Sequence, residues 1–144
     1  TEEFVVVSSL SSGADYEHMF ELAPVSLWLE DFSELKRLFD GWRAQGVTDI
    51  RSHLAEDPAR LRQCSASLRV LQVNRRTLEL FSADSLEHLV ANLDQVFRDD
   101  RHDTASHELA QLWDGQLEFS NQTVNYALDG RRLDVQVRAH SAGP

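Results

Sequence analysis

The hydrophobic and polar positions of the chain follow two different periods, which predict short strands separated by groups of helices. Residues 25–30 alternate at every second position, as a half-buried strand does, and residues 68–73 form a second strand. Residues 32–66, between these strands, predict an inserted helical block. Its first helix has one apolar stripe, which consists of Leu35, Leu38, Phe39 and Trp42. Such a stripe must pack on the domain itself or on a partner.

The alternation in the first strand predicts which of its faces is buried. Leu27 and Leu29 point to one side and are expected to face the core, whereas Trp28 and Glu30 lie on the opposite, more polar side. A lone exposed tryptophan at this position would be costly. We therefore expect an N-terminal helix or a partner to cover Trp28.

The period changes at Asn74, where the second strand turns directly into a helix. Asparagine is a good N-cap, because its side-chain oxygen accepts a hydrogen bond from a backbone N–H at the start of the helix. We expect the donor to be the N–H of Arg76 or Thr77. Two further helices follow, and the longer one extends from about Arg101 to Asp114.

The C-terminal part of the chain predicts a β-hairpin. Its turn signal is the dipeptide Asp129–Gly130, which is typical of two-residue turns. A turn of that length pairs Leu128 with Arg131 and thereby fixes the register of both strands.

This register decides which side chains of the hairpin face inward. It places Gln122 and Tyr126 on the inner face, together with the apolar residues of both strands. The apolar positions that precede this segment are out of phase with it. We therefore expect a bulge between Phe119 and Val124.

Composition and charge exclude several classes of partner and site. The chain has 144 residues, which suits a single domain, and it has no apolar run long enough for a membrane span. Its net charge of −10 disfavours nucleic acid and anionic membranes as partners, so no direct membrane contact is expected. Cys64 is the single cysteine, which rules out an internal disulfide and favours a cytoplasmic location.

Three stretches of the sequence resemble a Per-ARNT-Sim (PAS) sensor domain: "ELAPVSLWLED", "LRVLQVNRRTLELFSADSLEHL" and "ELAQLWDGQLEFSNQTVNYALDGRRLDVQVRAH". The resemblance depends on the order of three features: an asparagine that opens a helix, an acidic-glycine pair after the long helix, and an Asp-Gly hairpin. It implies an α+β fold in which helices cover one face of an antiparallel sheet and leave room for a ligand. Residues 1–14 would form an N-terminal segment, and residues 15–144 one PAS-like domain with a helical insertion at 32–66.

Two departures from the family pattern affect this expectation. The helical block replaces a tight hairpin and resembles an insertion in some bacterial sensor proteins. The family sheet also has five strands with the last in the middle, whereas only four follow residue 24, so the last strand is expected to be missing. The segment from Phe4 to Ser9 is β-prone and unassigned. We expect it to form a strand that fills the gap between subunits, the alternative being a loose tail.

The resemblance also directs attention to cofactors. Flavin-binding members carry an Asn-Cys-Arg-Phe-Leu-Gln motif, which is absent here. Haem-binding members use a histidine of the long helix or nearby, but His107 lies opposite the apolar face and His102 suits a helix start or a surface position. The spacing of these two histidines is poor for sharing a metal. We therefore expect neither flavin nor haem nor a bound metal.

Two classes of function stay open. The resemblance implies a sensory and interaction module of a bacterial signalling protein, with a small-molecule ligand or a second subunit as partner and a homodimer as assembly. Its output domain would be a histidine kinase or a diguanylate cyclase in the same chain. The alternative is a small cone-shaped α+β enzyme of the isomerase or dehydratase kind, which needs an acid or a tyrosine in its cavity.

Candidate residues follow from these expectations. The predicted ligand-binding residues are Phe81, Val96, Phe97, Leu109, Gln122 and Tyr126, although their aromatic rings would also suit a solid core. The predicted subunit interface is the apolar stripe of the helical block. No catalytic residue is expected, because the predicted register brings Tyr126, but no acidic residue, to the inner face. A cavity carboxylate with a strongly raised pKa would favour the enzyme.

Overall fold

The computed structural model describes residues 2–7, 14–98, 102–116 and 118–140, and it has an α+β fold. The side chains of residues 14–16 and 102–104 lie outside this description. In chain order, the elements are β1 (Glu2–Val7), α1 (Ala14–Leu22), β2 (Ser26–Asp31), α2 (Ser33–Ala44), α3 (Ile50–Glu56), α4 (Pro58–Ala66), β3 (Arg69–Val73), α5 (Arg75–Phe81), α6 (Leu86–Ala91), α7 (Leu93–Val96), α8 (His102–Trp113), β4 (Glu118–Tyr126) and β5 (Arg132–His140). Among these helices, none is long and apolar enough to cross a lipid bilayer.

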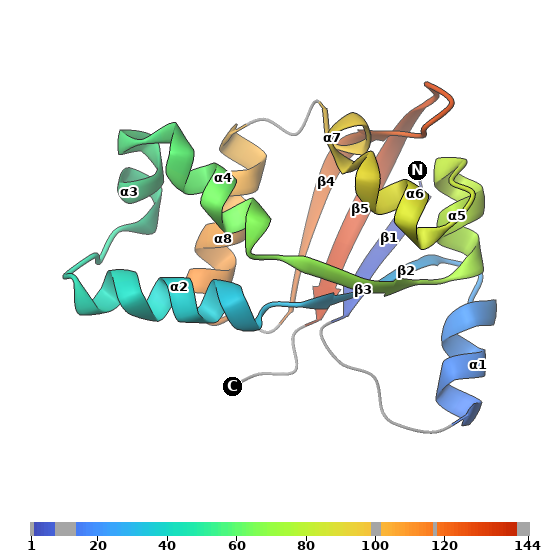
Figure 1. The fold of residues 1–144 in the computed structure, drawn as a ribbon, viewed down its shortest axis with the longest axis horizontal. Coiled ribbons are helices and arrows are strands. Elements are labelled where there is room, and N and C mark those ends of the chain that lie inside the picture. The colour runs from blue at the N-terminus through green and yellow to red at the C-terminus, as the bar shows by residue number, and fades with distance from the viewer. Residues whose placement is uncertain (1, 8–13, 99–101, 117, 141–144) are drawn as a thin grey trace.

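Five strands form one mixed sheet in the order β3-β2-β1-β5-β4 (Figure 1). β1 lies at the centre and is parallel to both of its neighbours, while the two outer pairs are antiparallel. The expectation of an antiparallel sheet is therefore wrong for the central pairs. The expected N-terminal strand is present, with Ser8 and Ser9 outside the described residues. It pairs with strands of its own chain. The expectation that it fills a gap between subunits is therefore wrong for this structure.

The connection from β1 to β2 explains how one chain supplies its own central strand. Parallel neighbours need a crossover of a dozen or more residues, which usually contains a helix. Residues 8–25, which include α1, connect the two strands. The expected pairing between subunits is therefore not required, because this crossover lets β1 reach the central position within one chain.

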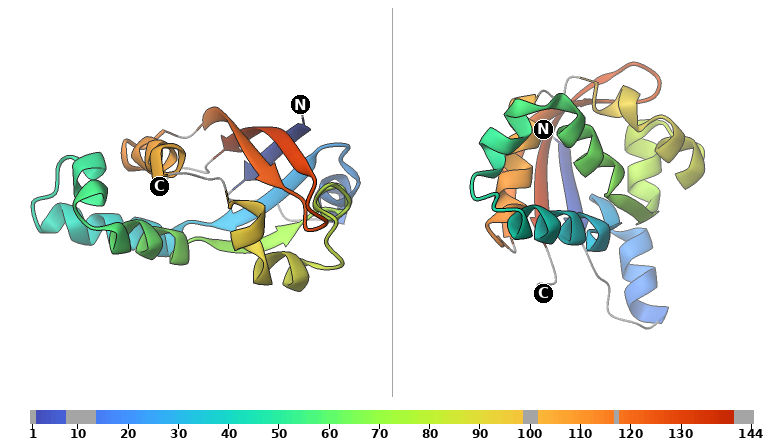
Figure 2. Two further views of the ribbon diagram at one scale, coloured as in Figure 1. Left: turned by 90° about the horizontal axis from the view of Figure 1, so that it is seen from above. Right: turned by 60° about the vertical axis from the view of Figure 1, so that its left-hand side comes forward.

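The helices gather in two groups at opposite ends of the molecule, with α2, α3, α4 and α8 at one end and α5, α6 and α7 at the other (Figures 1 and 2). The apolar stripe of α2 is buried in the first group. Leu35, Phe39 and Trp42 are at most 7% exposed, and Leu38 is partly buried beside them. The ring of Phe39 lies 5.1 Å from that of Trp113 in α8. The stripe therefore packs within its own chain, which leaves these side chains no free face for the predicted subunit contact.

The inner face of the sheet forms a second core, which contains the face of β2 that was expected to be polar. Trp28 is fully buried, stacks on Phe4 at a ring-centroid distance of 4.4 Å, and meets Phe81 edge-on at 5.6 Å. Leu27 and Leu29 point to the other side of the sheet and are only partly buried. The predicted orientation of β2 is therefore reversed, because both of its faces carry large apolar side chains and the alternation alone does not choose between them.

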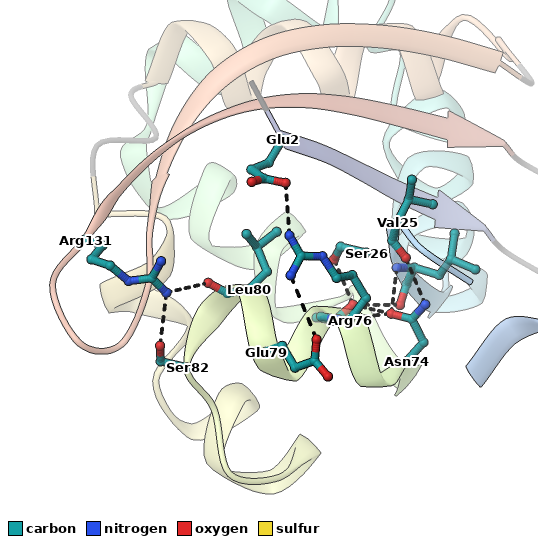
Figure 3. A network of polar contacts seen from close by, with 11 residues as sticks. Glu2, Val25, Ser26, Asn74, Arg76, Glu79, Leu80, Ser82 and Arg131 are labelled. Carbon is teal, nitrogen blue, oxygen red and sulfur yellow. Dashed lines mark hydrogen bonds and ion pairs between the residues drawn. The ribbon is translucent and has the colours of Figure 1, made fainter. Parts of the chain in front are cut away.

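Asn74 begins α5 as predicted and also ties three segments together (Figure 3). Its side-chain oxygen accepts from the backbone N–H of Thr77 at 3.1 Å, which is the N-cap contact, and from that of Leu27 at 3.0 Å. Its amide nitrogen donates to the carbonyl oxygens of Phe20 and Val25 at 3.0 and 2.9 Å. Because the residue is fully buried, this one side chain fixes the end of α1 and the start of β2 to α5.

The β4–β5 hairpin has a three-residue turn instead of the predicted two-residue turn. The N–H of Ala127 donates to the carbonyl oxygen of Arg131 at 2.9 Å, and Gly130 adopts a φ of 95°. Three-residue hairpin loops commonly end with a residue in this left-handed conformation. The pairing therefore differs by one residue from the prediction, so that Asn125 lies opposite Leu133.

A shift of one residue turns every side chain of a strand to the other face. In β4 it brings Asn125 to the inner face and moves Gln122 and Tyr126 to the outer face, contrary to the prediction. The pairing of β4 with β5 is also continuous, so the expected bulge between Phe119 and Val124 is absent. With Phe119 and Asn125 in the same phase, no bulge is needed to keep both on the inner side.

Candidate functional site

A cavity of about 460 Å³ lies between the inner face of the sheet and helices α4, α7 and α8. Small-molecule sites have volumes of roughly 300–1,000 Å³, so the cavity is large enough for a ligand. All five strands contribute to its wall. It lies where the two cores meet, because Leu109 belongs to the core of the α2–α4 and α8 group and Phe97 packs against the core on the sheet.

Most of the wall is apolar, and aromatic rings make up a large part of it. Phe4 comes from the central strand β1, Phe32 from the junction of β2 and α2, Phe97 from the end of α7, and Phe119 from the start of β4. The rings thus approach the cavity from the sheet and from both helical groups. A ligand with an apolar body would find contacts along the whole wall.

Glu30 adds a carboxyl group to this apolar wall. It follows Trp28 on the inner face of β2, at an irregularity in the pairing of β2 with β3 between Leu29 and Glu30. The side chain is half-buried, and burial raises the pKa of Glu30 from 4.5 to about 7. The adjacent Asp31 behaves differently, since a hydrogen bond from the Ser33 side chain lowers its pKa. Near neutral pH, Glu30 therefore exists in both its protonated and its ionised forms.

Asn125 is fully buried and reaches the cavity wall from β4. Neither its side-chain oxygen nor its side-chain nitrogen has a hydrogen-bond partner among the described residues. An unpaired buried polar group costs about 1–3 kcal/mol, so an apolar side chain would be more stable at this position in a solid core. The unpaired amide is the strongest indication that the cavity receives a polar group.

Comparisons with known proteins do not identify this chain. No protein-family model matches it, and neither a curated protein nor a solved structure matches it.

The structure brings two of the six predicted ligand-binding residues to the cavity wall, namely Phe97 and Leu109. Phe81 and Val96 are fully buried in the core on the sheet and do not belong to the described wall. Both side chains fill the core, and Phe81 meets the wall ring of Phe4 edge-on at 5.9 Å, which is the core role that the sequence also allowed. Their predicted contact with a ligand has no support in the geometry.

Gln122 and Tyr126 do not reach the cavity, because the shifted register turns them to the outer face. Asn125 and Glu30, which line the wall, were not predicted from the sequence. If the hairpin strands had been paired from a three-residue turn, the alternation would have placed the side chain of Asn125 on the inner face. Assigning Trp28 to the core would have placed Glu30 there as well, since the two alternate onto one face.

The residues weighed as cofactor or metal ligands lie elsewhere. Cys64 is buried in the α2–α4 and α8 group, and burial raises the pKa of its thiol to about 11, which makes it an unreactive structural cysteine. His107 is exposed, with its Nδ1 atom 2.6 Å from a guanidinium nitrogen of Arg51. The side chain of His102 lies outside the described residues. Within the described residues, no group of three or more His, Cys, Asp or Glu side chains could hold a metal ion.

The arrangement can therefore do two things chemically. It can hold a small molecule through apolar contacts along the rings and through hydrogen bonds to Asn125. It can also exchange a proton with that molecule at Glu30, whose pKa lies near neutral pH.

Proposed function

We propose that this chain is a sensory module that detects a small molecule in its cavity and relays the signal to another part of a bacterial signalling protein. Asn125 carries the proposal, because both polar atoms of its buried amide lack a partner among the described residues and lie at the wall of a cavity of about 460 Å³. A ligand that pairs with the amide would recover free energy that the unliganded fold gives up. Ligand binding and fold stability are thus linked at this residue.

The fold supports a PAS-like module. Helices cover the inner face of the sheet, and one strand lies in the middle between the pair β2–β3 and the hairpin β4–β5 (Figure 1). In the family pattern the last strand occupies this central position, whereas here β1 occupies it. Asn74, which opens α5 directly after β3, fits the same pattern.

Helix α8 offers a route for the signal. Leu109 and Leu112 line the cavity, and Leu109 and Trp113 also pack in the core of the α2–α4 and α8 group. A ligand that displaces α8 would therefore alter the packing of α2, because Trp113 contacts Phe39. The proposal extends to an output domain of the histidine kinase or diguanylate cyclase type and to a homodimer; these two points rest on the sequence resemblance alone.

Native mass spectrometry, absorbance and thermal unfolding test this proposal. We expect bound molecules, where present, to be small and colourless, so a flavin or Soret band would contradict that part. A fragment library of neutral, cationic and anionic compounds should contain members that raise the Tm of the wild-type chain.

A cavity-filling variant shows whether such a rise comes from the cavity. Ala139 lines it from β5, so Ala139→Phe should abolish the rise. Ala91 is exposed on α6, so Ala91→Phe is the matched control and should keep the rise. Circular dichroism verifies that both variants fold. The proposal is overturned if no compound distinguishes the two variants.

Glu30 favours a second candidate function, an enzyme of the isomerase or dehydratase kind. A general base is most effective when its pKa lies near the operating pH, and burial brings the pKa of Glu30 to about 7. The side-chain N–H of Asn125, which has no acceptor in the described part of the chain, can stabilise a developing oxyanion. A compound that is converted by the wild type but not by Glu30→Gln would favour the enzyme, whereas binding without conversion favours the sensor.

A further inference from the structure

Among the described residues, the charged side chains on the cavity wall are all acidic. Glu30, Asp94 and Glu108 line it from β2, α7 and α8, and no lysine, arginine or histidine lines it within the described part of the chain. Asp94 is exposed at the rim, whereas Glu30 and Glu108 are partly buried. An anionic ligand would meet like charge on three elements, and a cationic ligand would meet opposite charge on all of them.

The two most distinctive polar groups lie toward different ends of the cavity. Asn125 is opposite Leu133, next to the hairpin turn. Glu30 lies beyond the pair of Val6 and Trp28, and Val6 is itself opposite Ala139 near the far end of β5. A single small polar group cannot contact both residues. A ligand that uses both must therefore be elongated.

The wall offers suitable contacts for the middle of such a ligand. The rings of Phe4, Phe32, Phe97 and Phe119 line the cavity. Methylene groups pack favourably against these rings, and the negatively polarised ring faces attract an ammonium group. At the far end, the amide of Asn125 can accept a hydrogen bond through its oxygen and donate one through its nitrogen.

We propose that the cavity binds an elongated organic ammonium ion. Its amine lies beside Glu30, its apolar chain lies along the phenylalanine rings, and its other end carries a hydroxyl or amide group that pairs with Asn125. This inference rests on the proposed function and deepens it, because it names the chemical class of the ligand.

A matched set of probes tests the charge preference. 12-Aminododecan-1-ol, dodecane-1,12-diol and 12-hydroxydodecanoate have the same chain, long enough for an elongated site, and differ in charge at one end. Isothermal titration calorimetry on the full chain should show that the amino alcohol binds at least about tenfold more tightly than the diol. The carboxylate should show no binding at millimolar concentration.

Glu30→Gln tests the position of the amine. We expect this variant to bind the amino alcohol about tenfold more weakly and to bind the diol as the wild type does. Glu118→Gln is the matched control, since Glu118 is 76% exposed on the outer side of β4. This control should change neither the affinity for the amino alcohol nor the affinity for the diol.

The pH dependence of binding has a defined sign. Around Glu30, the described acidic side chains on the cavity wall are Asp94 and Glu108, while Arg37 and Arg69 act on the neighbouring carboxylate. Because the pKa of Glu30 is about 7, protonation should weaken binding of the amino alcohol about tenfold between pH 8 and pH 6. Glu30→Gln should remove this dependence.

Asn125→Leu tests the far end of the ligand. Dodecylamine lacks the hydroxyl group of 12-aminododecan-1-ol. The substitution should therefore weaken binding of the amino alcohol and leave the affinity for dodecylamine unchanged or higher. The ratio of the two affinities is insensitive to small changes in fold, which affect both probes alike.

The outcomes separate this inference from the proposed function. If the diol binds as tightly as the amino alcohol, or if the carboxylate binds best, the ammonium assignment is overturned while the sensory proposal stands. If none of the probes binds, the ammonium assignment is also overturned, and the library and the Ala139→Phe variant still decide the sensory proposal independently.

Discussion

Two asparagines of this chain are fully buried, and their surroundings are opposite. Asn74 hydrogen-bonds the backbone of Leu27, Thr77, Phe20 and Val25, whereas Asn125 has no partner among the described residues. The first residue lies between α1, β2 and α5, and the second lies on a cavity wall. A buried polar side chain thus acts structurally where its bonds are complete, and it points to a ligand where they are incomplete beside a cavity.

Strand β2 passes from one environment to the other within a few residues. The hydroxyl groups of Ser26 and Thr77 lie 2.7 Å apart, and the indole N–H of Trp28 donates to the hydroxyl oxygen of Ser26 at 3.0 Å. These groups extend the network around Asn74. Glu30, two residues after Trp28, faces the cavity, and burial alone raises its pKa. The comparison therefore predicts that substitutions in the network around Asn74 lower the stability of the fold, whereas substitutions of the polar residues on the cavity wall raise it.

The largest effect is expected from Asn74→Ala. The substitution leaves four buried or partly buried backbone groups without partners and should lower the free energy of unfolding by about 3–5 kcal/mol. Urea unfolding followed by circular dichroism measures the change. Asn121→Ala is the matched control and should cost no more than about 1 kcal/mol, because within the described residues the Asn121 side chain makes one hydrogen bond, to Gln111 at 3.0 Å. Equal losses for the two variants would break the comparison.

The next effect concerns Glu30 and pH. Its pKa is raised from 4.5 to about 7 on folding, so the folded chain holds the proton more tightly and stability falls as pH rises through this range. A shift of this size corresponds to at most about 3 kcal/mol. Glu30→Gln should therefore be progressively more stable than the wild type between pH 5 and pH 8. The measured quantity is the difference between their unfolding free energies, in which the other titrating groups cancel. A difference that does not change with pH would show that Glu30 is solvated.

A smaller effect of the opposite sign to that of Asn74→Ala is expected from Asn125→Leu. Leucine has a similar size and removes two unpaired buried atoms, so the unliganded chain should become about 1–2 kcal/mol more stable. The same urea experiment applies. A loss of stability would mean that Asn125 has bonds in solution equivalent to those of Asn74, and the contrast between the two residues would disappear.

The same pair of residues shows how far sequence reasoning reaches. The N-cap role of Asn74 depends on local chemistry, a strand followed by a helix, and it was predicted together with the helical block and the N-terminal strand. The inward orientation of Asn125 depends on the length of the hairpin turn, where one residue changes every face. The orientation of β2 depends on which apolar side meets the helices, and the position of β1 depends on tertiary pairing. Periodicity contains none of this information.

The smallest effect is expected at the turn that sets this register. Gly130 has a φ of 95°, and a Cβ atom built there would meet nothing within 4 Å, so Gly130→Ala introduces backbone strain alone, which costs about 1 kcal/mol. Gly46 has a φ of 97° and equally open surroundings at the end of α2, so Gly46→Ala should cost a similar amount. Hydrogen exchange distinguishes the two variants. Gly130→Ala should speed exchange of the amides in the pairing of Asn125 with Leu133, whereas Gly46→Ala should leave them unchanged. If both variants behave alike there, the turn does not control the face of Asn125, and the register must be held by the packing of β5 against β1.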